Sequence, residues 1–79
     1  MKVTVRYFAV LRDRSGIESE TVETSAVSAR ALADELSERH RLGLPSSLIR
    51  VAVNGAFVDD MAAIRDGDEV VLIPPVAGG

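Results

Sequence analysis

The residues best suited to chemistry stand at the end of the chain, in the stretch IPPVAGG. Gly78 and Gly79 carry no side chain, so they can enter a channel one backbone wide and adopt dihedrals that other residues avoid. The functional group at this tip is the α-carboxylate of Gly79, which is ionised at neutral pH. A carboxylate becomes an acyl donor once one oxygen is part of a leaving group, such as a mixed anhydride with a nucleotide phosphate. The pattern therefore predicts a carrier tail that another enzyme activates.

Two prolines precede this tip. Pro74 and Pro75 cannot donate hydrogen bonds to a sheet, and each favours extended geometry in the residue before it. We therefore expect the last strand to end at Ile73 and the chain to leave the sheet as a stiff spacer, close to polyproline II, with Val76 and Ala77 after it. The chain then divides into a folded domain over residues 1–73 and an extended tail over 74–79.

Alternating side chains predict the first strands that must hold this tail. Apolar and polar residues alternate from Lys2 to Phe8, as in a half-buried strand. Ser15 and Gly16 predict a turn, and residues 17–23 a second strand, so that the two strands form a hairpin.

One helix follows. Ser28 is a good N-cap, and apolar residues recur with helical spacing from Ala29 to Leu36. Gly43 is expected to close the helix. His40, in the last turn, is expected to be a solvated cation near the negative end of the helix dipole, without a catalytic role.

The second half of the chain predicts three more strands. Asn54-Gly55 is typical of a two-residue hairpin turn between a strand over 49–53 and one that begins at Phe57. Asp59 and Asp60 are expected to cap a short turn of helix, and Asp66-Gly67-Asp68 to form the tight turn before a last strand over 69–73. Turn and cap roles account for these carboxylates, and their spacing fits no metal site.

The predicted order, β-β-α-β-β-β, favours an α+β fold with one mixed sheet packed on a single main helix. The first and last strands are the most apolar, so we expect them to be neighbours at the centre. The other face of the sheet would meet water. This is the β-grasp, or ubiquitin-like, arrangement, with an extended Gly-Gly tail.

Composition narrows the function classes. The chain has 79 residues, a net charge of -3 and no cysteine. The charge disfavours nucleic acid as a partner, and a reducing compartment suits a chain without thiols. The charged and apolar alternation at the start is neither a secretory signal nor a membrane anchor, so we expect a cytoplasmic protein that does not bind membranes.

Three stretches carry a family resemblance. They are FAVLR from Phe8, VAVN from Val51 and DGDEVVLIPPVAGG from Asp66. Together they resemble the small sulfur-carrier subunit of molybdopterin synthase, over the whole length of the chain.

The resemblance implies a reaction partner at every step. An ATP-dependent activating enzyme, itself similar to ubiquitin-activating enzymes, would convert the carboxylate of Gly79 to an acyl-adenylate. A sulfur donor protein would turn this into a thiocarboxylate. The large catalytic subunit of molybdopterin synthase would then pass the sulfur to a pterin precursor. On this interpretation the chain binds no cofactor and is a carrier in a transferase complex, not an enzyme on its own.

Docking residues follow from the same resemblance. The residues matching Phe8, Phe57 and Ile73 form an apolar patch against the large subunit and the activating enzyme, and Arg12 belongs to the matching motif. The tail residues expected to contact partners are Pro74, Pro75, Val76 and Ala77, with Gly78 and Gly79 at the reacting end. The alternatives are that Phe8 and Phe57 are ordinary core residues and that Arg12 is a solvated strand end.

The residues leave other functions open. Sulfur carriers of thiamine and cysteine biosynthesis share the fold and the Gly-Gly end. A ubiquitin-like modifier that forms isopeptide bonds, or a binding module that needs only its surface, also fits the sequence.

Overall fold

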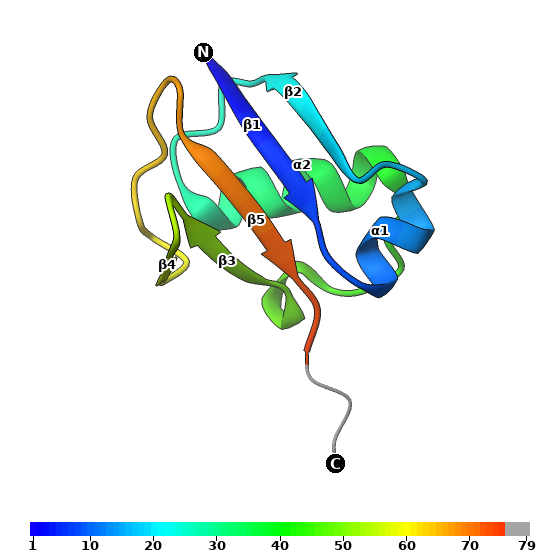
Figure 1. The fold of residues 1–79 in the computed structure, drawn as a ribbon. Coiled ribbons are helices and arrows are strands. Elements are labelled where there is room, and N and C mark those ends of the chain that lie inside the picture. The colour runs from blue at the N-terminus through cyan, green and yellow to red at the C-terminus, as the bar shows by residue number, and fades with distance from the viewer. Residues whose placement is uncertain (76–79) are drawn as a thin grey trace.

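We describe the protein from a computed structural model, in which residues 1–75 are described (Figure 1). The elements, in chain order, are β1 (Lys2–Tyr7), α1 (Val10–Ser15), β2 (Ser19–Glu23), α2 (Ala29–His40), a 3-10 turn η1 (Ser46–Leu48), β3 (Arg50–Val53), β4 (Ala56–Val58) and β5 (Glu69–Ile73).

The five strands form one mixed sheet in the order β2-β1-β5-β3-β4. The central pair, β1 and β5, is parallel, with Tyr7 beside Leu72. The pairs β1–β2, β3–β5 and β3–β4 are antiparallel. The prediction that the first and last strands lie together at the centre is confirmed, as is the end of the last strand at Ile73.

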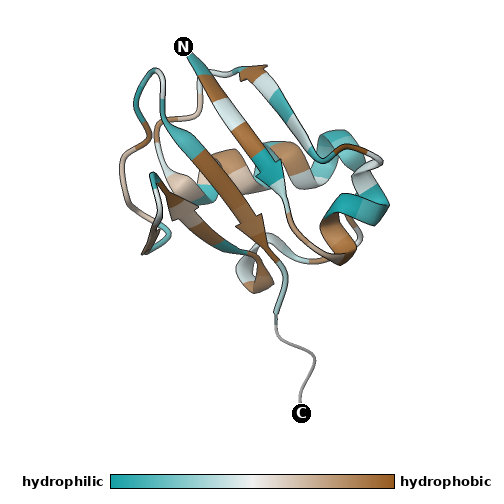
Figure 2. Ribbon diagram, in the orientation of Figure 1, coloured by the Kyte–Doolittle hydropathy of each residue, from teal (hydrophilic) through white to brown (hydrophobic). Residues whose placement is uncertain are grey.

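Helix α2 covers one face of the sheet, and within residues 1–75 no helix lies over the opposite face (Figure 1). The core lies between α2 and the sheet, because every second residue of β1 and β5 points toward α2. In Figure 2, brown bands alternate with paler ones along β1, whereas β5 is brown along most of its length because its outward residues are apolar too. Fully buried side chains include Val5, Leu32, Leu36, Val70 and Leu72. The expected α+β, β-grasp fold is confirmed.

The sequence places the start of α2 correctly. The Ser28 hydroxyl accepts a hydrogen bond from the Ala31 N–H at 3.2 Å, which satisfies one of the N–H groups that a helix start leaves free. The other end differs from expectation. Arg41, not Gly43, is the left-handed C-cap, with φ 50°. Gly43 also has a positive φ of 75°, two residues later.

The connection between β1 and β2 corrects the predicted hairpin turn at Ser15-Gly16. The two strands do pair antiparallel, but helix α1 lies between them. Gly16 ends this helix in the left-handed region, φ 74°, and its N–H donates to the Arg12 carbonyl at 2.9 Å. The helix forms because Leu11 is fully buried against the core, an attraction that turn propensities do not include.

The segment after β4 is also different from expectation, because no helix forms over residues 59–64. Asp59 caps a turn through the Met61 N–H, and Ala63 then pairs with Ser28 in an isolated β-bridge. The Ala62 carbonyl accepts from the Ala29 N–H at 2.9 Å. The segment stays extended because its carbonyls satisfy N–H groups at the start of α2.

Among the described residues, no helix has the length and apolar character needed to cross a membrane.

Candidate functional site: the open sheet face and the root of the tail

The root of the tail is the end of β5. Ile73 is partly exposed, Pro74 is buried and Pro75 is exposed. The burial of Pro74 corrects the expectation of a free spacer that starts directly after the strand, because this proline still packs on the body of the domain. Val76, Ala77, Gly78 and Gly79 lie outside the described residues.

The open face beside this root follows from strand register. Val71 and Ile73 lie two residues apart on β5 and therefore share a face. Ala52 pairs with Val71 on one side and with Phe57 on the other. Phe57 is 56% exposed. An apolar strip thus runs across three strands on the face opposite α2.

Phe8 extends this strip beyond the end of β1. Its side chain is 60% exposed, while its N–H donates to the Leu72 carbonyl at 3.1 Å. The next residue, Ala9, has φ 51° and ψ -125°, a conformation that favours glycine. The turn closes by a 3.0 Å bond from the Leu11 N–H to the Phe8 carbonyl. This strained turn holds the Phe8 ring outward while it buries Leu11.

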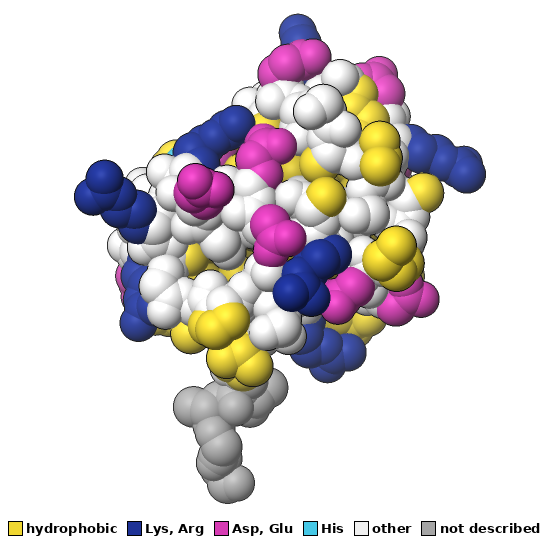
Figure 3. Space-filling view, turned by 180° about the vertical axis from the view of Figure 1, so that it is seen from behind, with side chains coloured by type: hydrophobic (Ala, Val, Ile, Leu, Met, Phe, Trp, Pro, Cys, Tyr) yellow, Lys and Arg dark blue, Asp and Glu magenta, His cyan; other side chains and the backbone are white. Residues whose placement is uncertain are grey.

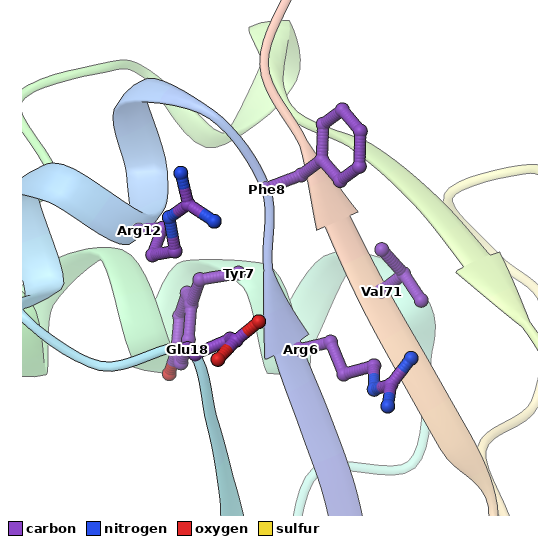
Figure 4. Close-up of a pocket in the computed structure, with 6 residues that line it drawn as sticks. All are labelled: Arg6, Tyr7, Phe8, Arg12, Glu18 and Val71. Atoms are coloured by element: carbon purple, nitrogen blue, oxygen red, sulfur yellow. The ribbon is translucent and has the colours of Figure 1, made fainter.

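A shallow pocket of about 290 Å³ lies at this point, drawn in Figure 4. Its lining residues are Arg6, Tyr7, Phe8, Arg12, Glu18 and Val71. In Figure 4, Phe8 and Val71 stand on the same side of the sheet, and Arg12 reaches from α1 toward the strand end. The pocket therefore joins the apolar strip to two arginines.

Arginines frame the open face. Arg6 pairs with Val71 in strand register, and Arg50 pairs with Ile73. The Arg50 guanidinium lies over the Phe57 ring, 4.1 Å from its centroid, in a cation–π contact. Within residues 1–75, Arg6, Arg12 and Arg50 form no ion pair. The face can therefore bind an apolar surface that is bordered by carboxylates.

The side of the molecule that carries α2 has a different distribution of charged side chains. In Figure 3, which views the side opposite to Figure 1, basic and acidic side chains are interspersed over α2 and its neighbours. Two i,i+4 ion pairs on α2, Arg30–Asp34 and Arg39–Glu35, account for part of this pattern. The open face therefore differs from this side by its apolar strip, with Arg6 and Arg50 beside it in strand register.

His40 is not the solvated cation that the sequence predicts. Its side chain is 13% exposed, and its Nε2 lies 2.7 Å from the Glu20 carboxylate. The Tyr7 hydroxyl donates to the same carboxylate at 2.5 Å, and the Tyr7 and His40 rings meet edge to face at 5.4 Å. The burial comes from contacts with β1 and β2, which helix position alone does not reveal.

The Glu20 carboxylate, which Tyr7 and His40 both contact, shapes the pKa shifts in this cluster. Burial raises the pKa of Tyr7 far above its ordinary value, and its bond to Glu20 raises it further. Burial acts to raise the pKa of Glu20 as well, but the hydrogen bonds from Tyr7 and His40, with the charge of His40, outweigh it and lower that pKa. Glu20 is therefore an ionised acceptor that joins β1, β2 and α2.

Asp66 and Asp68 lie in the turn before β5, as expected, and both accept hydrogen bonds from backbone N–H groups. Asp66 accepts from the Lys2 N–H at 2.8 Å, and Asp68 accepts from the Arg65 N–H at 2.8 Å. The Arg65 bond and a second bond from Asn54 lower the pKa of Asp68. Over residues 1–75, no three His, Asp or Glu side chains gather as metal ligands would.

The structure brings together the described part of the predicted site. Phe8, Phe57 and Arg12 are exposed, and the first two are not core residues. Sequence reasoning missed Val71 and the flanking arginines, Arg6 and Arg50. The alternation in β5 could have indicated Val71, because Val70 and Leu72 take the buried positions and leave it on the outer face.

Comparison with known proteins agrees with this geometry. The model of the ThiS family matches residues 5–79, which include the last strand and the whole tail. The chain belongs to the ThiS family.

Two proteins similar to this ThiS-family chain are named for molybdopterin synthesis. The molybdopterin synthase sulfur carrier subunit of Chlamydomonas reinhardtii is 34% identical over 83 residues, with 100% of each chain covered. The solved structure of a putative molybdopterin converting factor, subunit 1, from Pyrococcus furiosus has a TM-score of 0.79 at 31% identity, over 96% of this chain and 99% of that one.

A second similar structure is a complex. It contains subunits 1 and 2 of the molybdopterin-converting factor of Helicobacter pylori, and the similarity has a TM-score of 0.69 at 29% identity, with both chains fully covered.

Proposed function

We propose that this chain is the sulfur-carrier subunit of molybdopterin synthase and that Gly79 carries the sulfur. The supporting observation is the match to the ThiS family through residue 79. Strand β5, which leads into the tail, lies beside the exposed face that carries Phe57 and the arginines. The Chlamydomonas reinhardtii relative, which matches over its full length, is named for this role.

The chemistry at Gly79 has two steps. A carboxylate oxygen attacks the α-phosphate of ATP, so that pyrophosphate leaves and an acyl-adenylate forms. Hydrosulfide supplied by a donor protein then attacks the carbonyl carbon, the C–O bond to AMP breaks, AMP leaves, and a thiocarboxylate and a proton remain. Both steps take place on partner enzymes, because the chain itself supplies only the acyl group and the surface that docks it. We place these steps in the cytoplasm, with no cofactor bound to the carrier.

The open face supplies the docking surface for a large subunit and an ATP-dependent activating enzyme. Phe8, Phe57 and Ile73 would contact apolar groups of the partner, and Arg12 would pair with a carboxylate there. The tail from Pro75 to Gly79 would enter the partner's active site. Because one face serves both partners, the carrier would have to leave one before it meets the other.

The test is the intact mass of the untagged chain after incubation with ATP, an activating enzyme and a sulfur source. We expect a mass gain equal to the difference between sulfur and oxygen, and no gain in a variant that lacks Gly79. An unchanged mass would contradict the carrier chemistry. Co-purification identifies the pathway: the large subunit of molybdopterin synthase is expected, and recovery of a thiazole synthase in its place would overturn the assignment.

A further inference from the structure

The amines of this chain are gathered at one end of the sheet. Of the nine Lys and Arg residues, Lys2 is the single lysine. It stands at the start of β1, next to the α-amino group of Met1, which donates to the Glu23 carboxylate at 3.2 Å and to the Thr24 carbonyl at 3.1 Å. Amines are the strongest nitrogen nucleophiles that a protein offers, so their position matters for a chain with an activated carbonyl carbon.

Strand register places these amines far from the tail. The Gly67 N–H donates to the Lys2 carbonyl at 2.8 Å, so Lys2 lies beside Gly67. From there the chain runs along β5 to Pro75, away from the N-terminal end (Figure 1). Eight residue steps of about 3.3 Å separate Gly67 from Pro75, or roughly 26 Å.

The tail is too short to return to Lys2. The four residues after Pro75 can span at most about 14 Å, whatever their arrangement. The four-carbon stem of lysine does not cover the difference. The carbonyl carbon of Gly79 therefore cannot meet an amine of its own chain while the sheet is folded.

The basic residues near the tail root are all arginine. Arg50 lies beside Ile73 in register, and Arg6 lies beside Val71. Adjacent strands are about 4.8 Å apart, so a side chain at either position is within reach of a tail that folds back. Arg12, from α1, lines the same pocket as Phe8. An arginine there presents a planar, delocalised guanidinium, whereas a lysine would present a primary amine that can act as a nucleophile.

We propose that Arg6, Arg12 and Arg50 protect the activated glycine from self-acylation because these positions carry arginine and not lysine. This inference depends on the proposed activation of Gly79. A lysine Nζ at one of these positions would attack the carbonyl carbon of the acyl-adenylate whenever the tail is outside the partner's active site. An isopeptide C–N bond would form, the C–O bond to AMP would break, AMP would leave and a proton would pass to solvent. The product is a closed ring that can no longer accept sulfur. Arginine keeps the positive charge of the open face and does not form this ring.

The test uses the full chain with a C-terminal thioester installed chemically, so that no activating enzyme is needed. The wild type is expected to hydrolyse only. In Arg50→Lys and Arg6→Lys, the new amine should expel the thiol and give a ring whose mass is that of the free acid less one water. A short tether gives an effective concentration in the millimolar range, so we expect the thioester to be lost at least about tenfold faster in these variants than in the wild type.

Arg65→Lys is the matched control, because it adds the same amine at the end of the sheet where Lys2 lies. It is expected to behave as the wild type. Equal ring formation in Arg65→Lys and in the two variants near the tail would overturn the proposal. So would closure of the wild type on Lys2 or Met1, located by peptide mapping. A chemically installed thioester reacts independently of any pathway, so this result and the mass-gain result can fail separately.

Discussion

At the scale of single residues, two side chains are held in arrangements that simple propensity does not favour. Ala9 occupies a backbone region suited to glycine, and Glu20 is an ionised acceptor between the buried Tyr7 ring and the partly buried His40 ring. The Ala9 dihedrals cost stability that the surrounding fold must offset, whereas the hydrogen bonds to Glu20 outweigh the cost of burying its charge. Both flank Tyr7 and Phe8, where the tail root and the open face meet.

Replacing Ala9 with glycine should stabilise the fold. The strained dihedrals cost about 1–3 kcal/mol, and the extra freedom of glycine in the unfolded chain returns roughly 0.5–1 kcal/mol of that, so we expect a net gain near 1 kcal/mol. Urea denaturation measures it. Ala56→Gly, on an exposed strand position, is the control and should lose stability. An equal loss in both variants would show that Ala9 is not strained.

Stability should fall in acid because of Glu20. Its pKa is lowered in the folded state, so the unfolded chain takes up the proton first, near pH 4.3. The contribution is therefore complete above that pH and is lost as pH falls through the folded pKa. Glu20→Gln should be less stable than the wild type at pH 7, by an amount that shrinks toward pH 3.

Urea midpoints measured from pH 7 to pH 3 check this expectation. Glu18→Gln, at an exposed position nearby, is the control and should follow the wild type. A Glu20→Gln deficit that stays constant over the whole range would contradict the sign worked out above.

At the scale of elements, the sequence predicts well where local pattern and tertiary packing agree. Helix α2 has both its cap and its apolar spacing in the sequence, and the Asn54-Gly55 turn is local. Helix α1 and the segment over 59–64 were predicted wrongly. The first has no side-chain cap and forms through the burial of Leu11, and the second is held extended by hydrogen bonds to α2.

In the candidate site too, the parts that local sequence pattern reveals could be predicted, and the parts that arise from tertiary packing could not. The tail, Phe8, Arg12 and Phe57 stand out by composition or by motif. The Arg50–Phe57 contact and the burial of His40 arise between residues distant in sequence, so no local pattern contains them. The strand order brings these residues together, and only the register fixes which of them face each other.

The cap of α2 gives a direct test at this scale. Ser28→Ala removes the acceptor for the Ala31 N–H and should destabilise the protein by about 1 kcal/mol. Thermal or urea denaturation is sufficient to detect the change. Ser25→Ala is a suitable control, since Ser25 is exposed and precedes the helix. Equal stability of the two variants would show that the Ser28 hydroxyl does not cap the helix.

At the scale of the whole molecule, the two faces of the sheet have different roles. One face and α2 hold the core, and the other presents aromatic and arginine side chains beside the end of β5 (Figure 1). Because exposed rings contribute little to the core, docking and folding can be changed separately.

Docking variants should separate these roles. Phe8→Ala and Phe57→Ala are expected to weaken binding to the large subunit by about tenfold or more, since buried aromatic anchors dominate interfaces. Val27→Ala and Met61→Ala, at positions 71% and 80% exposed elsewhere on the surface, should bind as the wild type. Titration calorimetry with the purified large subunit provides the comparison. Equal weakening in all four variants would place the interface elsewhere.

The parallel pairing of β1 with β5 also decides how this protein can be attached to other materials. Reagents that couple through primary amines can react only at the pole that holds Met1 and Lys2. A resin or sensor chip prepared with such a reagent would hold every molecule in one orientation, with the opposite pole turned to the solution. Immobilised carrier could then be loaded, washed and offered to successive partners without a tag near the glycines.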